Sequence, residues 1–127
     1  MRTILIPAII IEPCVEVEVQ NNDFMGTMER LRVLVDGYFE IVHTIHLVAL
    51  ADRSISTTPI VMLVDEDGHY NRKPINSRAS RFYGNLRDEV VGDAVFLGQY
   101  SGSEGADLIS LPDYFTLEYF MGRTGLR

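Results

Sequence analysis

The chain has 127 residues, of which 46% are apolar and 23% charged, and its formal net charge is −7. This length predicts a single domain spanning residues 1–127, and the acidic charge weighs against general nucleic-acid binding. The only cysteine, Cys14, excludes a disulfide framework within one chain, and it favours a reducing, cytoplasmic setting.

The N-terminal part of the chain predicts two strands followed by a helix. Residues 3–11 are apolar around Pro7 and predict a first strand, because this run is too short to span a bilayer and lacks the features of a signal peptide. We therefore expect no membrane association. Residues 15–20 alternate valine with polar residues and predict a strand with one wet face. Apolar residues recur at helical spacing over residues 24–35, and Gly37 is the expected left-handed end of that helix.

The middle of the chain predicts two further strands and a short helix. Residues 38–48 are rich in aromatic and β-branched residues and predict a strand. Residues 60–65 form an unbroken apolar run before an acidic turn, which predicts a buried interior strand. A return strand over residues 70–73 would complete a hairpin. A short helix over residues 76–84 would begin at Asn76 as its cap.

The C-terminal part predicts a strand at residues 94–97, a glycine- and serine-rich loop at 98–105, a short strand at 108–111 and a helix opening at Pro112. Strands and helices are thus interspersed, and most connections read as hairpins. We predict an α+β fold. It would have a mixed or mostly antiparallel sheet, two longer helices and one short helix.

The sequence contains no legible catalytic or metal-binding arrangement. The acidic turn at residues 65–68 lacks the spacing of a calcium loop. His43 and His46 fall on opposite faces of the predicted strand and cannot share one metal. Neither a phosphate-binding loop nor a nucleophile elbow is present, and Cys14 reads as a buried, inert thiol. We therefore expect no enzyme activity, no catalytic residue, no metal and no cofactor.

The basic residues are unevenly distributed. A cluster around the short helix contains no acid between its members, and its four central residues are the candidate binding residues for an anion or a partner: Arg72, Lys73, Arg78 and Arg81. We expect Arg78 and Arg81 to share a solvent-facing side of the helix. The alternative is that the arginines of this cluster pair with Asp65, Glu66 and Asp67 of the acidic turn, or are merely solvated.

Five ordered blocks resemble a family of small uncharacterised domains from bacteriophages and bacterial mobile elements, with the pattern VxGYxEVV, VDExG, NxxA, YG and VGD. These blocks are Val35–Val42, Leu63–Gly68, Pro74–Ser80, Tyr83–Gly84 and Val91–Val95. Asp36 departs from the pattern, which has a second glycine there, and the departure is expected to alter only the helix exit. The resemblance supplies no catalytic residues.

The resemblance implies a phage or prophage accessory protein in the cytoplasm of a bacterial host. We expect it to act without catalysis by binding a host protein, in a host-takeover or anti-defence role. The alternative is a protein that sequesters an anionic nucleotide through the basic helix. The sequence leaves the oligomeric state open, and a homodimer is possible.

Overall fold

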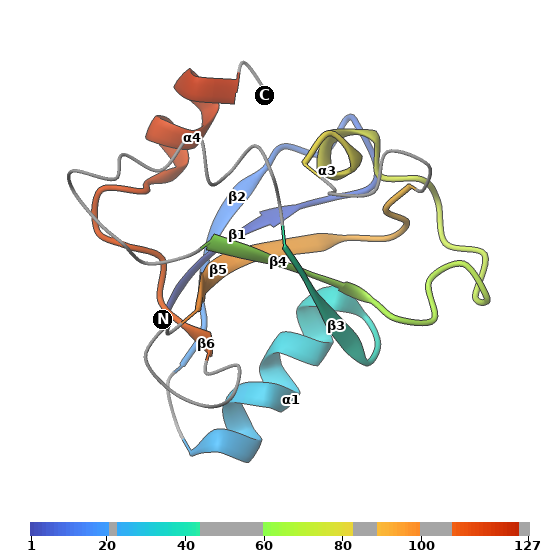
Figure 1. The fold of residues 1–127 in the computed structure, drawn as a ribbon, viewed down its shortest axis with the longest axis horizontal. Coiled ribbons are helices and arrows are strands. Elements are labelled where there is room, and N and C mark those ends of the chain that lie inside the picture. Colours follow the sequence, from blue (N-terminus) through green and yellow to red (C-terminus); the bar gives the residue numbers. More distant parts are fainter. Residues whose placement is uncertain (21–22, 44–59, 83–88, 100–107, 125–127) are drawn as a thin grey trace.

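A computed structural model describes residues 1–20, 23–43, 60–82, 89–99 and 108–124. Within these ranges the elements are β1 (Arg2–Ile6), β2 (Val15–Glu18), α1 (Phe24–Val35), β3 (Phe39–His43), β4 (Ile60–Asp65), α3 (Ser77–Ser80), β5 (Ala94–Gln99), β6 (Leu108–Ile109) and α4 (Leu117–Thr124) (Figure 1). This arrangement confirms the predicted α+β class.

The strands form one six-stranded sheet in the order β2-β1-β5-β4-β3, with β6 also paired to β5. All of these pairings are antiparallel. β5 is the centre of the sheet, because Phe96 pairs with Ile4 of β1 and also with Met62 of β4. β6 lies beyond the start of β1 on the same side of β5, where Ile109 pairs with Gly98.

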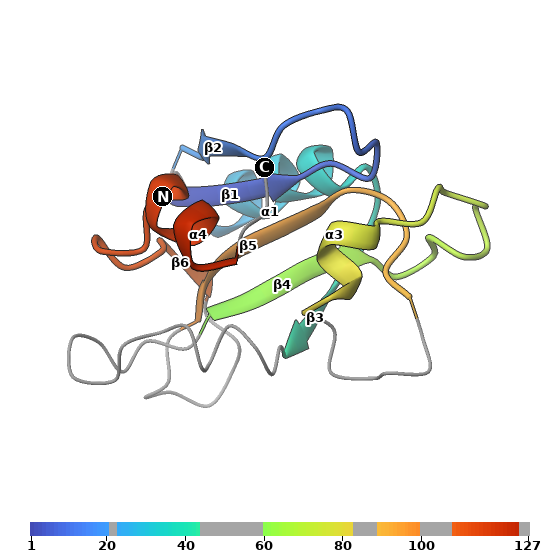
Figure 2. The same ribbon diagram turned by 90° about the horizontal axis from the view of Figure 1, so that it is seen from above.

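Helices cover both faces of the sheet. α1 lies on one face, and α3 and α4 lie on the other (Figures 1 and 2). Val61 and Leu63 of β4 belong to the core beneath α1, whereas Ile60, Met62 and Val64 belong to the core beneath α3 and α4. Because alternate residues enter two different cores, β4 has no wet face. The prediction that residues 60–65 form a buried interior strand is confirmed.

The expectation of two longer helices is wrong. α1 has 12 residues as predicted, but α4 begins at Leu117 rather than at Pro112 and has only 8. Local turns occupy the intervening residues, since the Phe115 amide donates to Pro112 O at 2.9 Å. The helix starts after Thr116, whose hydroxyl accepts from the Tyr119 amide at 3.0 Å and so caps its first turn.

Two predicted strand segments are turns in the structure. β1 ends at Ile6 and not at residue 11, and the Glu12 amide closes a turn by donating to Ile9 O at 3.0 Å. Residues 66–72 are turns, so the predicted return strand at 70–73 is also wrong. Its physical reason is that β3 and β5 already occupy both edges of β4.

The short helix is confirmed at its start but is shorter than predicted. α3 has 4 residues, and the Asn76 side chain accepts from the Ala79 amide as the expected cap. Ala79 and Phe82 are buried as predicted. The predicted stop at Gly84 lies outside the described residues. None of the helices in the described ranges is long and apolar enough to cross a bilayer.

Candidate functional site

The four predicted cationic residues do not form one surface. Arg72 and Arg81 are exposed, but the side chain of Lys73 is only 15% exposed and Arg78 is 6% exposed. The expectation that Arg78 shares a solvent-facing side with Arg81 is therefore wrong. Its physical reason is that backbone carbonyls of the β1–β2 connection lie within reach of the guanidinium and compensate its burial.

Lys73 holds the end of β4 to the end of α1. Its ammonium lies 2.6 Å from Asp65 Oδ2 and also donates to the carbonyl oxygens of Val35 and Asp36. These carbonyls belong to the C-terminal turn of α1, where a positive charge is favourable. One member of the basic cluster, Lys73, thus pairs with Asp65 of the acidic turn.

Asp65 is a buried carboxylate in a favourable environment, with a side chain only 1% exposed. Burial acts to raise the pKa of Asp65, but the Lys73 ammonium and the Asp67 amide, which donates to Oδ1 at 2.9 Å, outweigh it. The net result is a lowered pKa. Gly37 makes room for this carboxyl group, because a Cβ atom there would lie 2.9 Å from Asp65 Oδ1.

The C-terminal end of α1 differs from the prediction. The left-handed residue that ends α1 is Asp36, with φ 59° and ψ 52°, and not Gly37. Aspartate tolerates this conformation better than most residues, although glycine adopts it without strain. A glycine at position 36 would therefore suit the observed backbone.

A second set of polar side chains holds the connection between β1 and β2. Arg78 Nη2 donates to Pro7 O at 2.6 Å and to Ile9 O at 3.1 Å. Asn76 Nδ2 donates to Ile6 O at 2.8 Å, and the Ala8 backbone amide donates to Asp93 Oδ1 at 2.9 Å. Residues from α3 and from the start of β5 thus fix this connection on both sides.

The connection presents three consecutive isoleucines to solvent. Ile9, Ile10 and Ile11 are 51%, 68% and 87% exposed. Sequence reasoning missed this feature because it assigned the whole apolar run to a strand. The available signal was Pro7, which cannot donate to a strand ladder and here precedes the turn. We call residues 9–11 the isoleucine turn.

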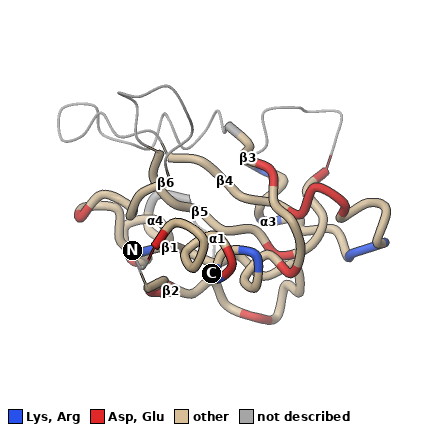
Figure 3. The backbone as a smooth tube through the Cα atoms, turned by 90° about the horizontal axis from the view of Figure 1, so that it is seen from below, with Lys and Arg blue, Asp and Glu red and all other residues tan. Residues whose placement is uncertain are grey.

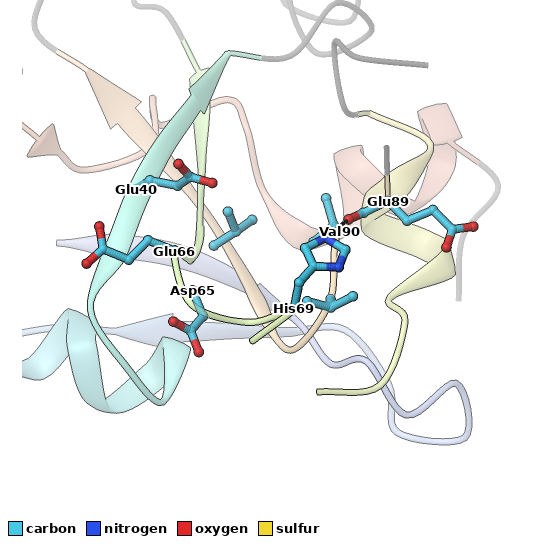
Figure 4. Close-up of a pocket in the computed structure, with 8 residues that line it drawn as sticks. Glu40, Asp65, Glu66, His69, Glu89 and Val90 are labelled. Carbon is cyan, nitrogen blue, oxygen red and sulfur yellow. Dashed lines mark hydrogen bonds between the residues drawn. The ribbon is translucent and has the colours of Figure 1, made fainter. Parts of the chain in front are cut away.

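A small pocket of about 50 Å³ lies between β3, the turn after β4 and the segment before β5. Its polar lining includes Glu40, Glu66, His69 and Glu89 (Figure 4). His69 Nε2 lies 3.0 Å from the carbonyl oxygen of Glu89, while the carboxylates of Glu66 and Glu89 point away from the imidazole (Figure 4). These carboxylates do not converge on a common point.

The described part of the chain contains no metal-binding cluster, and its cysteine is buried. No group of three or more histidine, cysteine, aspartate or glutamate residues there is placed to hold a metal ion. His46 lies outside the described residues. Cys14 is 4% exposed, as predicted. Burial raises the pKa of the Cys14 thiol, an effect that the nearby Arg78 guanidinium only partly opposes.

Comparison with known proteins finds one family. A family model described as "Domain of unknown function (DUF3846)" matches residues 5–122. No curated protein and no solved structure matches the chain. The matched range contains all five sequence blocks noted above.

Proposed function

We propose that this chain, which belongs to the family Domain of unknown function (DUF3846), acts without catalysis by binding a protein of a bacterial host. A phage or prophage origin and a cytoplasmic site of action are part of this proposal, and they rest on the resemblance described above. The role would be host takeover or evasion of defence. The isoleucine turn is the structural observation that carries the binding function.

Exposed isoleucines in a row are unusual on a protein that carries net charge −7. Full burial of one such side chain contributes roughly 1.5–3 kcal/mol. Three of them would contribute at most roughly 4–9 kcal/mol before the costs of association, which is a substantial part of what a weak complex requires. The isoleucine turn is therefore large enough to anchor a partner.

The turn is also held in place before any partner arrives. Arg78 and Asp93 fix its backbone through the bonds to Pro7, Ile9 and Ala8. A pre-ordered loop loses little conformational entropy when it binds, which favours affinity. In this proposal Arg78, one of the predicted site residues, positions the binding surface and does not touch the partner.

The second candidate function, sequestration of an anionic nucleotide, has less support. Arg72 and Arg81 are exposed and available to an anion, but Lys73 and Arg78 are engaged with the protein's own oxygens. None of the four lines the pocket described above. Nucleotide released by heating the purified protein would favour this alternative.

The experiment is affinity capture from host lysate with the full chain and two variants. Ile10→Ser/Ile11→Ser removes the exposed apolar surface and leaves the backbone contacts of the turn in place. Val33→Ser is the control, because Val33 is a comparably exposed apolar side chain on α1, 74% exposed. We expect a host protein to be captured by the wild type and the control but lost from the turn variant. Equal capture by all three would reject the isoleucine turn as the binding surface.

A further inference from the structure

β3 is the last strand of the sheet in the described part of the chain, and its register shows which groups face outward. Phe39 pairs with Asp65 while the Glu66 amide donates to Tyr38 O at 2.9 Å. In an antiparallel ladder this makes Phe39–Asp65 a non-hydrogen-bonded pair. The backbone N–H and C=O groups of Phe39 and Ile41 therefore point away from β4, toward the side where the described residues place no further strand.

An apolar groove runs beside this edge on the α1 face. It has a volume of about 310 Å³ and is lined by Phe24, Met25, Met28, Arg32, Tyr38, Phe39 and Glu66. Phe24 and Met25 are each 68% exposed, and Arg32 lies over the Tyr38 ring at 4.9 Å from its centroid. Methionine side chains adapt readily to apolar groups of different shape. The groove lies where alternate side chains of a strand added to β3 would fall.

The opposite edge of the sheet differs in the residues that face outward. In β2, the Val19 amide donates to Met1 O and Arg2 pairs with Glu18, so the outward backbone groups belong to Glu16 and Glu18. Their side chains pair with Arg2 and with the N-terminal amine. Charged side chains on an edge strand discourage further pairing. In β3 the corresponding residues are Phe39 and Ile41, which are apolar.

Charge around the β3 edge selects the kind of segment that would bind. The exposed residues Asp36, Glu40, Glu66 and Asp67 surround it, and Figure 3 shows acidic positions on β3 and on the turn that follows β4. Arg32 is the basic residue of the groove. A second copy of this chain would bring the same acidic residues against these, whereas a basic segment would be attracted.

We propose that the β3 edge and its groove bind an extended segment of a partner protein as an added strand, one that alternates apolar and basic residues. Main-chain hydrogen bonds to Phe39 and Ile41 would supply affinity, and the groove and the acidic residues would supply selectivity. This proposal does not depend on the isoleucine turn, which lies on the connection between β1 and β2 across the sheet.

The test uses a synthetic peptide that alternates valine and lysine over eight residues. Its control is the same peptide N-methylated at every residue, which removes the N–H donors of both edges and keeps the charge and the side chains. Titration into the full ¹⁵N-labelled chain should shift the amide signals of Phe39 and Ile41 for the first peptide only. We expect Glu40→Lys/Glu66→Lys to weaken binding at least tenfold.

The matched control variant is Glu12→Lys, which also replaces an exposed acid with lysine but lies away from β3. It should bind the peptide within about twofold of wild type, since surface charges far from the contact are screened. Absence of binding by the unmethylated peptide, equal binding of both peptides, or shifts confined to β2 would overturn the proposal. Self-association of the chain that is abolished by Glu40→Lys would also overturn it in favour of a second copy.

Discussion

Breaking the ion pair between Asp65 and Lys73 should destabilise the protein far more than removing an exposed cation. In Asp65→Asn, the Lys73 ammonium keeps its contacts with Val35 O and Asp36 O but loses a carboxylate 2.6 Å away. In Lys73→Met, the Asp65 carboxylate stays buried with the Asp67 amide and the Asn71 side chain to compensate it, but with no cation beside it in the described part of the chain. Lys73→Met thus leaves a buried carboxylate without its cation, and Asp65→Asn leaves the Lys73 ammonium, among the described residues, with only the exposed Asp36 carboxylate, 3.8 Å away.

The expected cost follows from burial. Removal of one partner of a buried ion pair typically costs about 3–5 kcal/mol, whereas an exposed pair contributes only about 0–1 kcal/mol. With side chains 15% and 1% exposed, this pair belongs to the first class. Arg81→Met is the control, because Arg81 belongs to the same basic cluster but is exposed, and its loss should change the free energy of unfolding by no more than about 0.5 kcal/mol.

Urea unfolding of the two single variants, the double variant and Arg81→Met would measure these free energies. The double variant should be more stable than the sum of the single losses predicts, because it removes both buried charges together. This comparison remains informative even if one single variant fails to fold. Losses below about 1 kcal/mol in both single variants would refute the reasoning, since they would place the pair among solvated surface contacts.

The same pair predicts an acid dependence of stability. The pKa of Asp65 is lowered from its ordinary value of 3.8 in the folded state. Its contribution is therefore fully present above the unfolded pKa and is lost as the pH falls through the folded pKa. Asp65→Asn should lack this part of the acid dependence. If the free energy of unfolding of Asp65→Asn falls at low pH as much as that of the wild type, other carboxylates cause the loss of stability.

Three further predictions follow from buried or strained positions. Met62→Ala should cost about 2–5 kcal/mol in urea unfolding, because Met62 is 0% exposed at the centre of the sheet; a loss below 1 kcal/mol would contradict the core assignment. Asp36→Gly should be more stable than Asp36→Ala by about 1 kcal/mol, because alanine is strained at φ 59°; equal stabilities would argue against the left-handed exit. Cys14 should react with iodoacetamide only on unfolding, since it is buried and its pKa is raised; rapid labelling of the native protein would refute this.

The sheet was largely predictable because its signals are local. The unbroken run at residues 60–65 correctly predicted a buried strand, and the alternation at 15–20 correctly predicted a strand, although β2 ends at Glu18 and is largely exposed. The errors arose where tertiary pairing decides the outcome. A return strand at 70–73 would have to pair with β4, but β5, which is remote in sequence, occupies that edge of β4. Apolar content alone also did not show that the first strand stops at Ile6.

The candidate site was less predictable because residues of one type have different roles in the fold. Arg78 and Arg81 are equivalent in sequence terms, yet one holds Pro7 O and Ile9 O while the other is solvated. That difference depends on where the β1–β2 connection passes, which no local pattern encodes. The sequence likewise does not show which backbone groups of β3 face away from β4, because this depends on the register and hydrogen bonds of the β3–β4 pair.

The central place of β5 also has a consequence for how the chain folds. β1 with β2 and β3 with β4 are two antiparallel pairs of neighbouring strands, and β5 joins them through contacts such as Ile4 with Phe96. Such a contact spans most of the chain and pays a large loop-closure entropy, which slows folding. During synthesis, β1 and β4 would each wait with one unpaired edge until Ala94–Gln99 leaves the ribosome. This interval is when the nascent protein would be most exposed to aggregation and most dependent on chaperones.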